Sequence, residues 1–147
     1  MSAGVTRAFS YADDALFPFI RLRWPAHPIP DASLERTYRD LEAMCRRGEH
    51  VVLVTFDDMH PHFTAKQRQF ITKFISSEHR MLTKNCRGLA IVSLEGDARG
   101  LVTALDWQSK SPFERGMFHT RREAIDWLGH RWRTLVGTPL SFSGAES

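Results

Sequence analysis

Two runs of the chain are apolar almost without interruption. Residues 51–56 (Val-Val-Leu-Val-Thr-Phe) and 89–94 (Leu-Ala-Ile-Val-Ser-Leu) are short and rich in β-branched side chains. Such runs are typical of strands that are buried on both faces of a sheet. The sequence therefore predicts two interior strands, and we expect them to be neighbours.

Two further segments alternate apolar and polar positions. The second half of residues 15–24 alternates apolar side chains with Arg21 and Arg23, and Pro18 before it indicates an edge strand or the start of a strand. Residues 113–119 alternate more loosely. We predict a strand in each segment, the first with one face in solvent.

Between these runs, apolar residues recur at three- and four-residue steps, which is typical of helices with one buried face. One helix should begin at Asp31, as its cap, and end at Gly48. Thr64 and Gln67 form a capping-box pair at the head of a long second helix. Residues 101–107 suit a short helix. The buried face of the long helix is expected to hold Phe70, Ile71, Phe74, Ile75 and Leu82.

The closing helix should begin where Thr120 and Glu123 can cap it. Its inward residues are expected to be Ala124, Trp127, Leu128 and Trp132. A second interpretation applies to Trp132, which stands between Arg131 and Arg133. Exposed Trp and Arg side chains are enriched where protein partners dock, so these three residues are a candidate docking edge.

Strands that alternate with helices through long connections favour a mixed or mostly parallel sheet with helices packed against it. The chain has 147 residues, of which 42% are hydrophobic, so it is long enough for one domain with its own core. We predict a single α/β domain over residues 12–133. Residues 1–11 and 134–147 are expected to be flexible termini.

Charge and cysteine content exclude several classes of function. Twenty Lys and Arg residues stand against seventeen Asp and Glu, and the basic ones are scattered instead of forming the stripe that nucleic acids require. Cys45 and Cys86 are isolated, which favours a reduced, cytoplasmic setting without a disulfide framework or zinc site. No apolar run approaches the roughly 20 residues that cross a bilayer, so no membrane span is expected.

The order of elements, together with Phe118-His-Thr-Arg-Arg-Glu-Ala-Ile-Asp-Trp-Leu128, resembles the STAS/SpoIIAA-like superfamily of small bacterial domains. Members of that superfamily typically end in a strand that leads into a helix with a cap, an acidic residue, an alanine and an apolar pair. The likeness spans about residues 16–132. It implies an STAS-like fold and a role in binding, because catalysis is not typical of these domains.

The same resemblance implies a phosphorylation site. Anti-sigma-factor antagonists of this superfamily carry a phosphorylatable Ser or Thr in an Asp-Ser-x-Gly turn after the central strand. The corresponding segment here runs from Asp57 to Thr64, and it is longer and lacks glycine. Thr64 stands at the start of a helix, where free backbone N–H groups and the helix dipole stabilise a phosphate. An ordinary capping role explains Thr64 equally well.

The same segment offers an alternative chemistry. Asp57, Asp58, His60 and His62 follow an interior strand, at the end where α/β sheets place ligands, and such side chains can hold a metal ion or transfer protons. An exposed interaction loop is the simpler interpretation, and we expect no metal. Glycine-rich phosphate loops and nucleophile elbows are absent from the sequence. We therefore expect no catalytic residues and no cofactor.

These observations predict a non-catalytic protein-interaction or regulatory module of the partner-switching type. It is expected to be a cytoplasmic homodimer with an unidentified protein partner, and its working surface should include the loop from Asp57 to Thr64. One alternative is an enzyme, dependent on a small ligand or a metal, that uses this loop. Another is a carrier of lipids or other hydrophobic ligands, with a dry pocket lined by Phe70, Phe74 and Trp107.

Overall fold

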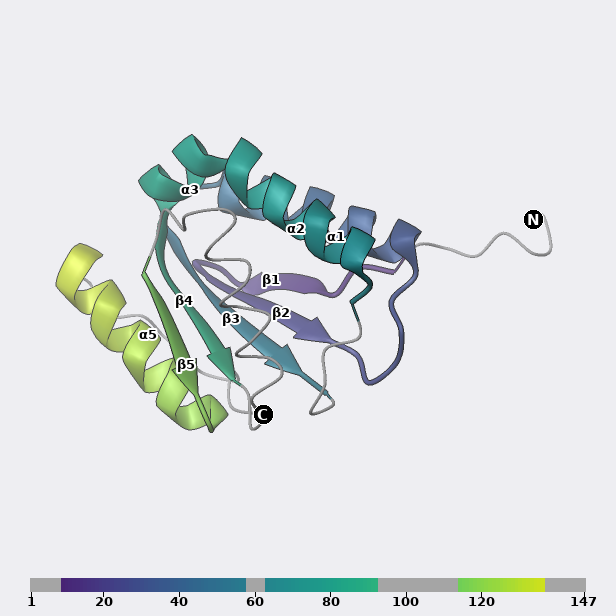
Figure 1. Ribbon diagram of the computed structural model, residues 1–147. Coiled ribbons are helices and arrows are strands. Elements are labelled where there is room, and N and C mark those ends of the chain that lie inside the picture. Colours follow the sequence, from purple (N-terminus) through teal and green to yellow (C-terminus); the bar gives the residue numbers. More distant parts are fainter. Residues whose placement is uncertain (1–8, 58–62, 93–113, 137–147) are drawn as a thin grey trace.

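A single sheet lies at the centre of the molecule. The computed structural model describes residues 9–57, 63–92 and 114–136 (Figure 1). Its strands, in sheet order, are β1 (Ala12–Leu16), β2 (Phe19–Trp24), β3 (His50–Phe56), β4 (Cys86–Val92) and β5 (Arg115–Phe118). β1 is antiparallel to β2, and the others run parallel to one another. The predicted α/β class with a mixed sheet is thus confirmed.

The two predicted interior strands are neighbours. β3 pairs with β2 on one side and with β4 on the other, both in parallel. β4 begins at Cys86, earlier than the sequence suggested, because the strand already pairs with His50 of β3 at that point. Ser93 and Leu94 lie outside the described residues. The prediction of adjacent interior strands is confirmed for the described part of this segment.

The first strand predicted from the sequence is in fact the second half of a hairpin. β1 pairs with β2 so that Ala12 lies opposite Leu22 and Asp13 opposite Arg21. β1 is therefore the edge strand. Of the two interpretations of Pro18, the edge position is wrong and the start of a strand is confirmed, because β2 begins at Phe19. β1 cannot be recognised from the sequence, because the strand is polar and irregular, as edge strands commonly are. Its register shifts between Asp13 and Leu16.

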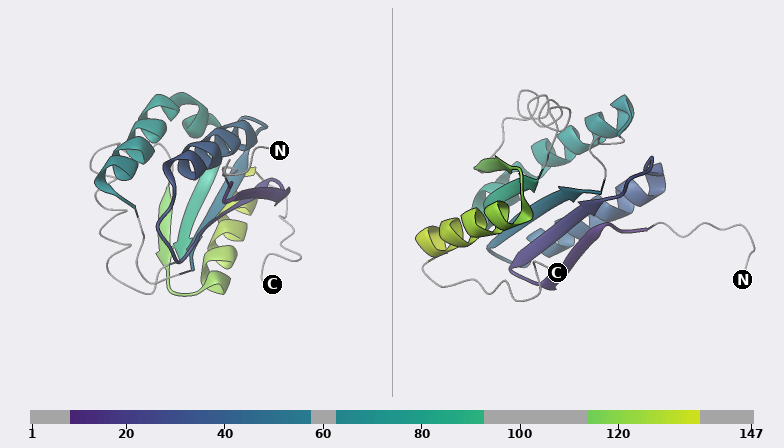
Figure 2. Two further views of the ribbon diagram at one scale, coloured as in Figure 1. Left: turned by 90° about the vertical axis from the view of Figure 1, so that its right-hand side faces the viewer. Right: turned by 90° about the horizontal axis from the view of Figure 1, so that it is seen from below.

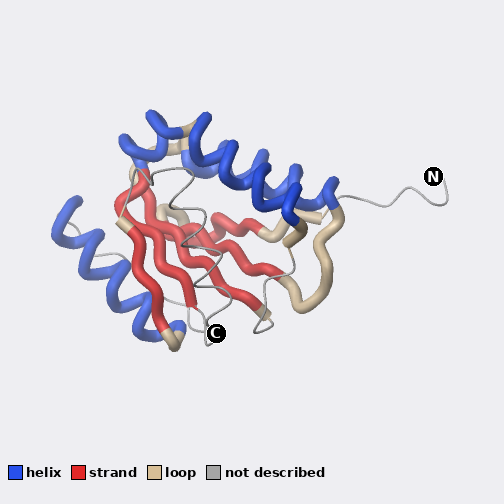
Figure 3. Tube along the Cα trace, viewed as in Figure 1, coloured by secondary structure: helices blue, strands red, loops and turns tan. Residues whose placement is uncertain are grey.

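Helices cover both faces of the sheet (Figure 3). They are α1 (Asp31–Cys45), α2 (Ala65–Ser77), α3 (His79–Asn85) and α5 (Arg121–Val136). The long helix expected after Thr64 is broken at Glu78, whose φ of −100° and ψ of 18° leave the helical region. The Glu78 carboxylate lies 2.7 Å from the guanidinium of Arg46, which ties the break to the end of α1.

Contacts and elements extend past both expected ends of the domain. α5 runs to Val136, beyond the boundary predicted at Arg133, and the backbone N–H groups of Phe9 and Tyr11 donate to Ser33 and Thr37 of α1. The predicted short helix over residues 101–107 and the tail from residue 137 lie outside the described residues. No helix in the described ranges is apolar over a length that could cross a membrane.

β3 is buried on both faces because its side chains alternate between two apolar clusters. Val52 and Val54 pack with α1, α2 and α3, whereas Val51 and Leu53 pack with α5. The α5 side of that cluster consists of Ala124, Ile125, Leu128 and Trp132, with Trp127 packed against it. This division accounts for the continuous apolar run in the sequence.

Coverage of the two faces is unequal. α5 packs over β4, β3 and β5. Seen from below, in the right panel of Figure 2, no described helix lies in front of most of β1 and β2 on the α5 side. Phe19, at the start of β2, is buried in the cluster that α5 forms. Among the described residues, the part of the sheet next to the beginning of α5 therefore has no helix over it.

His50 should make folding stability depend on pH. Its side chain is completely buried and Nδ1 donates to the Gly48 carbonyl at 2.9 Å, leaving Nε2 without a partner among the described residues. Burial, with a smaller contribution from Arg87, lowers the pKa of His50 below the usual 6.5 despite that bond. The unfolded chain therefore takes up a proton at a higher pH than the folded chain does, and stability is lost as pH falls below 6.5.

We predict that the free energy of unfolding, measured by urea titration, falls between about pH 7 and about pH 5, and falls less in His50→Gln. The exposed His79 provides the matched control, since His79→Gln should retain the wild-type dependence. An identical loss of stability in His50→Gln and wild type would contradict this role for the buried ring.

Candidate functional site

A groove of about 520 Å³ opens on the part of the sheet that α5 leaves uncovered. Its lining comes from residues 9–13, from β2 and β3, from the connection after β2 and from Arg121, the first residue of α5. Leu53 and Thr55 of β3 contribute from the sheet itself. The groove lies within the volume range of about 300–1,000 Å³ that is common for ligand sites.

The strand pattern explains why arginines line this groove. Along β2, alternate side chains point to opposite faces, so Leu22 and Trp24 join the core under α1 while Arg21 and Arg23 point the other way. On the same face, Phe19 at the start of β2 is buried in the cluster that α5 forms, and Arg21 and Arg23 lie further along the strand, in the groove lining. The wet face predicted for this strand is therefore correct, and it forms part of the groove.

Two ion pairs belong to the groove lining. Arg21 Nη2 lies 2.5 Å from Asp13 Oδ2, and Arg23 Nε lies 2.6 Å from Asp57 Oδ1. Asp13 also accepts a hydrogen bond from Ala15 N at 2.8 Å. The hydrogen bond from Ala15 N makes the largest contribution to lowering the pKa of the Asp13 carboxyl, and the contact with Arg21 lowers this pKa further. Burial acts in the opposite direction and does not outweigh them. Asp13 is thus held by two donors.

The Arg23–Asp57 pair is more exposed. The Arg23 side chain is 66% exposed and that of Asp57 35%. Exposed pairs of this kind typically contribute about 0–1 kcal/mol to stability. Replacement of Asp57 by another carboxylate on Arg23 therefore costs little free energy.

Arg121 differs from the other two arginines. Among the residues that the structure describes, its guanidinium has no carboxylate partner, although it lines the same groove. Its position follows from the predicted cap, because Thr120 Oγ1 accepts a hydrogen bond from Glu123 N at 3.1 Å and fixes the start of α5. Three arginines therefore face two aspartates in the groove lining.

Phe9 supplies exposed apolar surface at the groove. It is 63% exposed, and it is the one large apolar side chain in the described ranges that is exposed to this degree. Its backbone is fixed, since Phe9 N donates to Ser33 Oγ at 3.0 Å and Tyr11 N donates to Thr37 Oγ1 at 3.1 Å. These two contacts join residues that are 24 and 26 positions apart, so no local pattern in the sequence indicates them.

The structure describes only part of the predicted interaction loop from Asp57 to Thr64. Asp57 lies at the end of β3 and joins the groove, as expected for a ligand-binding position. Asp58, His60 and His62 lie outside the described residues. Within the described ranges, no three His, Cys, Asp or Glu side chains are grouped so that they could hold a metal ion.

Thr64 caps α2. Its Oγ1 accepts a hydrogen bond from Gln67 N at 3.1 Å, and Gln67 Oε1 accepts one from Thr64 N at 3.0 Å. The predicted capping box is confirmed. The buried Gln67 also donates to Ile29 O and to Asp31 Oδ1. Pro30, and not Asp31, is the N-cap of α1, because the Asp31 carboxylate is used in this contact with α2.

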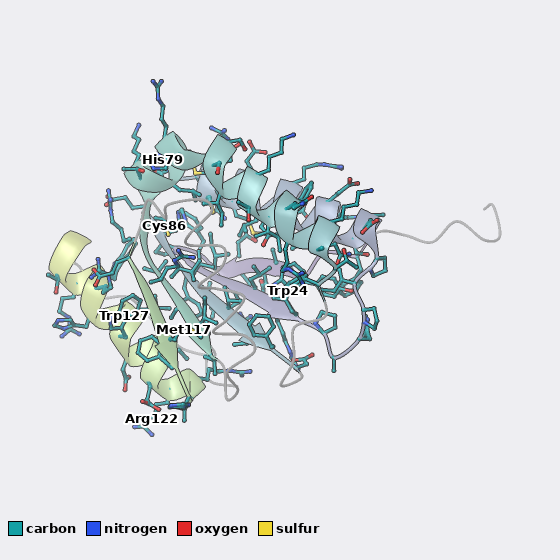
Figure 4. The ribbon with its side chains drawn as sticks, in the orientation of Figure 1. Trp24, His79, Cys86, Met117, Arg122 and Trp127 are labelled. Carbon is teal, nitrogen blue, oxygen red and sulfur yellow. The ribbon has the colours of Figure 1, made fainter. Side chains whose placement is uncertain are left out.

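The candidate docking edge is wrong for Trp132. This side chain is only 6% exposed, because it lies one helical turn after Leu128 on the face that packs against the sheet. Arg131 lies over the Trp127 ring, donates to Arg87 O at 3.1 Å and pairs with Glu114. Figure 4 shows Trp127 between α5 and β5. Of the three residues, Arg133 alone is exposed.

A second cavity lies between the sheet and helices α1, α2 and α3. It has a volume of about 100 Å³ and an almost entirely apolar lining that includes Phe74. Phe70 packs near this core, and Trp107 lies outside the described residues. Pockets for lipid-sized ligands are several times larger, so the described cavity does not favour a carrier.

The two cysteines line this second cavity and are buried. Burial raises the pKa of the Cys86 thiol to about 12 and that of Cys45 further. Thiolates are the reactive form of cysteine, so neither side chain is activated as a nucleophile. Both cysteines are free thiols in the structure.

No protein-family model, curated protein or solved structure matches this chain.

For the predicted loop, the capping role of Thr64 can be tested directly. We expect Thr64→Ala to lower the free energy of unfolding by about 1 kcal/mol, because it leaves an N–H group at the start of α2 without its acceptor. Thr64→Ser keeps the hydroxyl and should stay close to wild type. Equal stability of both variants, measured by urea unfolding, would contradict a capping role.

Proposed function

We propose that this chain is a non-catalytic regulatory module that binds a protein partner in the groove on the open part of its sheet. The observation that supports this most directly is the combination of an exposed, anchored Phe9 with three arginines in one concave surface. Aromatic and arginine side chains are the types enriched at the centres of protein interfaces.

The proposal extends to the type of module. An STAS-like domain is supported by the closing strand β5, which leads directly into α5 through the Thr120 cap and the Glu123-Ala124 pair. Partner switching through phosphorylation of Thr64, a cytoplasmic location and homodimerisation remain predictions. Thr64 is an exposed residue at the head of α2, as a phosphorylation site requires, and phosphorylation there would compete with the capping hydrogen bond from Gln67 N.

Removal of the aromatic anchor tests the proposal. We expect Phe9→Ala to reduce capture of the partner from the native host by at least about fivefold, since an interface anchor typically contributes more than 1 kcal/mol. Capture is compared with wild type by quantitative mass spectrometry. Phe9→Trp keeps a large ring and should retain the partner, and thermal unfolding should show that both variants are folded. Unchanged partners and yields in Phe9→Ala would contradict the groove as the binding surface.

A further inference from the structure

We infer that the groove accepts an acidic segment of the partner, and that the Arg23–Asp57 ion pair opens to admit it. This inference rests on the proposed function and specifies the chemistry of the partner. It assigns a different role to each charged side chain of the groove.

Arg121 is the first point of attachment. Its guanidinium lines the groove and has no carboxylate partner within the described part of the chain. A carboxylate from the partner can bind there without breaking an existing ion pair. The planar guanidinium also matches a carboxylate with two parallel hydrogen bonds. The start of α5 adds the positive end of a helix dipole at the same place.

Arg23 is the second point of attachment, and Asp57 competes for it. Both side chains reach solvent, and one hydrogen bond of 2.6 Å joins them. A carboxylate of the partner can therefore replace Asp57 on Arg23. Arg21 is less available, because its partner Asp13 is already fixed by Ala15 N. The expected order of importance is Arg121, then Arg23, then Arg21.

An acidic polypeptide segment fits the groove better than a free inorganic anion. The arginines attract a negatively charged ligand, but the exposed Phe9 ring belongs to the same lining and offers an apolar contact that an inorganic anion does not use. A chain that carries both acidic and apolar side chains uses both features. The competing carboxylates of Asp13 and Asp57 also disfavour binding of an isolated anion.

The test uses a fluorescein-labelled peptide, Glu-Glu-Phe-Glu-Glu-Glu, and fluorescence anisotropy at low ionic strength. We expect Arg121→Glu to weaken binding at least tenfold. Arg122→Glu makes the same change of charge on the neighbouring exposed residue, at the same end of α5 (Figure 4), and should weaken binding much less. An acidic residue in the first turn favours a helix, so the fold should survive, and Arg121→Gln provides a second, neutral variant.

Removal of the competing carboxylate gives the most specific result. We expect Asp57→Asn to tighten peptide binding several-fold, because Arg23 is then released. Glu35→Gln removes the same charge from an exposed position on α1 and should change affinity little. A role of Asp57 in the fold alone would not increase affinity for an acidic peptide.

Three results would overturn the inference. Equal effects of Arg121→Glu and Arg122→Glu would show only general electrostatics, and so would equal effects of Asp57→Asn and Glu35→Gln. Full displacement of the peptide by inorganic phosphate, together with unchanged affinity in Phe9→Ala, would indicate a site for small anions. If the peptide fails these tests while Phe9→Ala still loses the native partner, the proposed function stands and the acidic chemistry is wrong.

Discussion

Burial of β3 on both faces is the constraint on which the rest of the structure depends. Its residues alternate between two apolar clusters, and each cluster requires helices on its own side. α1, α2 and α3 meet this requirement on one face, and α5 meets it on the other. Parallel pairing with β2 and β4 then fixes the position of the neighbouring strands.

The groove follows from the way in which this requirement is met. A single helix, α5, is enough to cover β3 and the strands beyond it, and among the described residues no helix covers the same face of β2 after Phe19. Charged side chains can therefore occupy β2 there without being buried. The beginning of α5 brings Arg121 to the edge of this open surface. A sheet covered unequally thus creates a concave, arginine-rich surface beside the carboxyl ends of β2 and β3.

The sequence predicts what depends on local pattern and misses what depends on distant contacts. The β-branched run of β3 and the caps at Thr64 and Thr120 could be predicted, because each involves residues that are close in the sequence. The hairpin strand β1 could not be predicted, since Asp13 and its neighbours lack an apolar pattern. They are recognised as a strand only by their backbone pairing with β2. The break lies at Glu78, which pairs with the distant Arg46 at the end of α1, and no local pattern marks it. The solvent-exposed face of β2 could be predicted from its alternating pattern. Its place in a groove could not, because that depends on where α5 begins in space.

The most direct test of this account compares two adjacent positions of β3. Val54 points into the core under α1 and α2 and is 7% exposed, whereas Thr55 lines the groove. Single cysteines are introduced at each position, and their reaction with a thiol reagent is followed in the folded protein, in which Cys45 and Cys86 are buried. The account predicts that the Thr55→Cys thiol reacts readily and the Val54→Cys thiol reacts only on unfolding. Equal protection of both thiols, or equal reactivity, would contradict it.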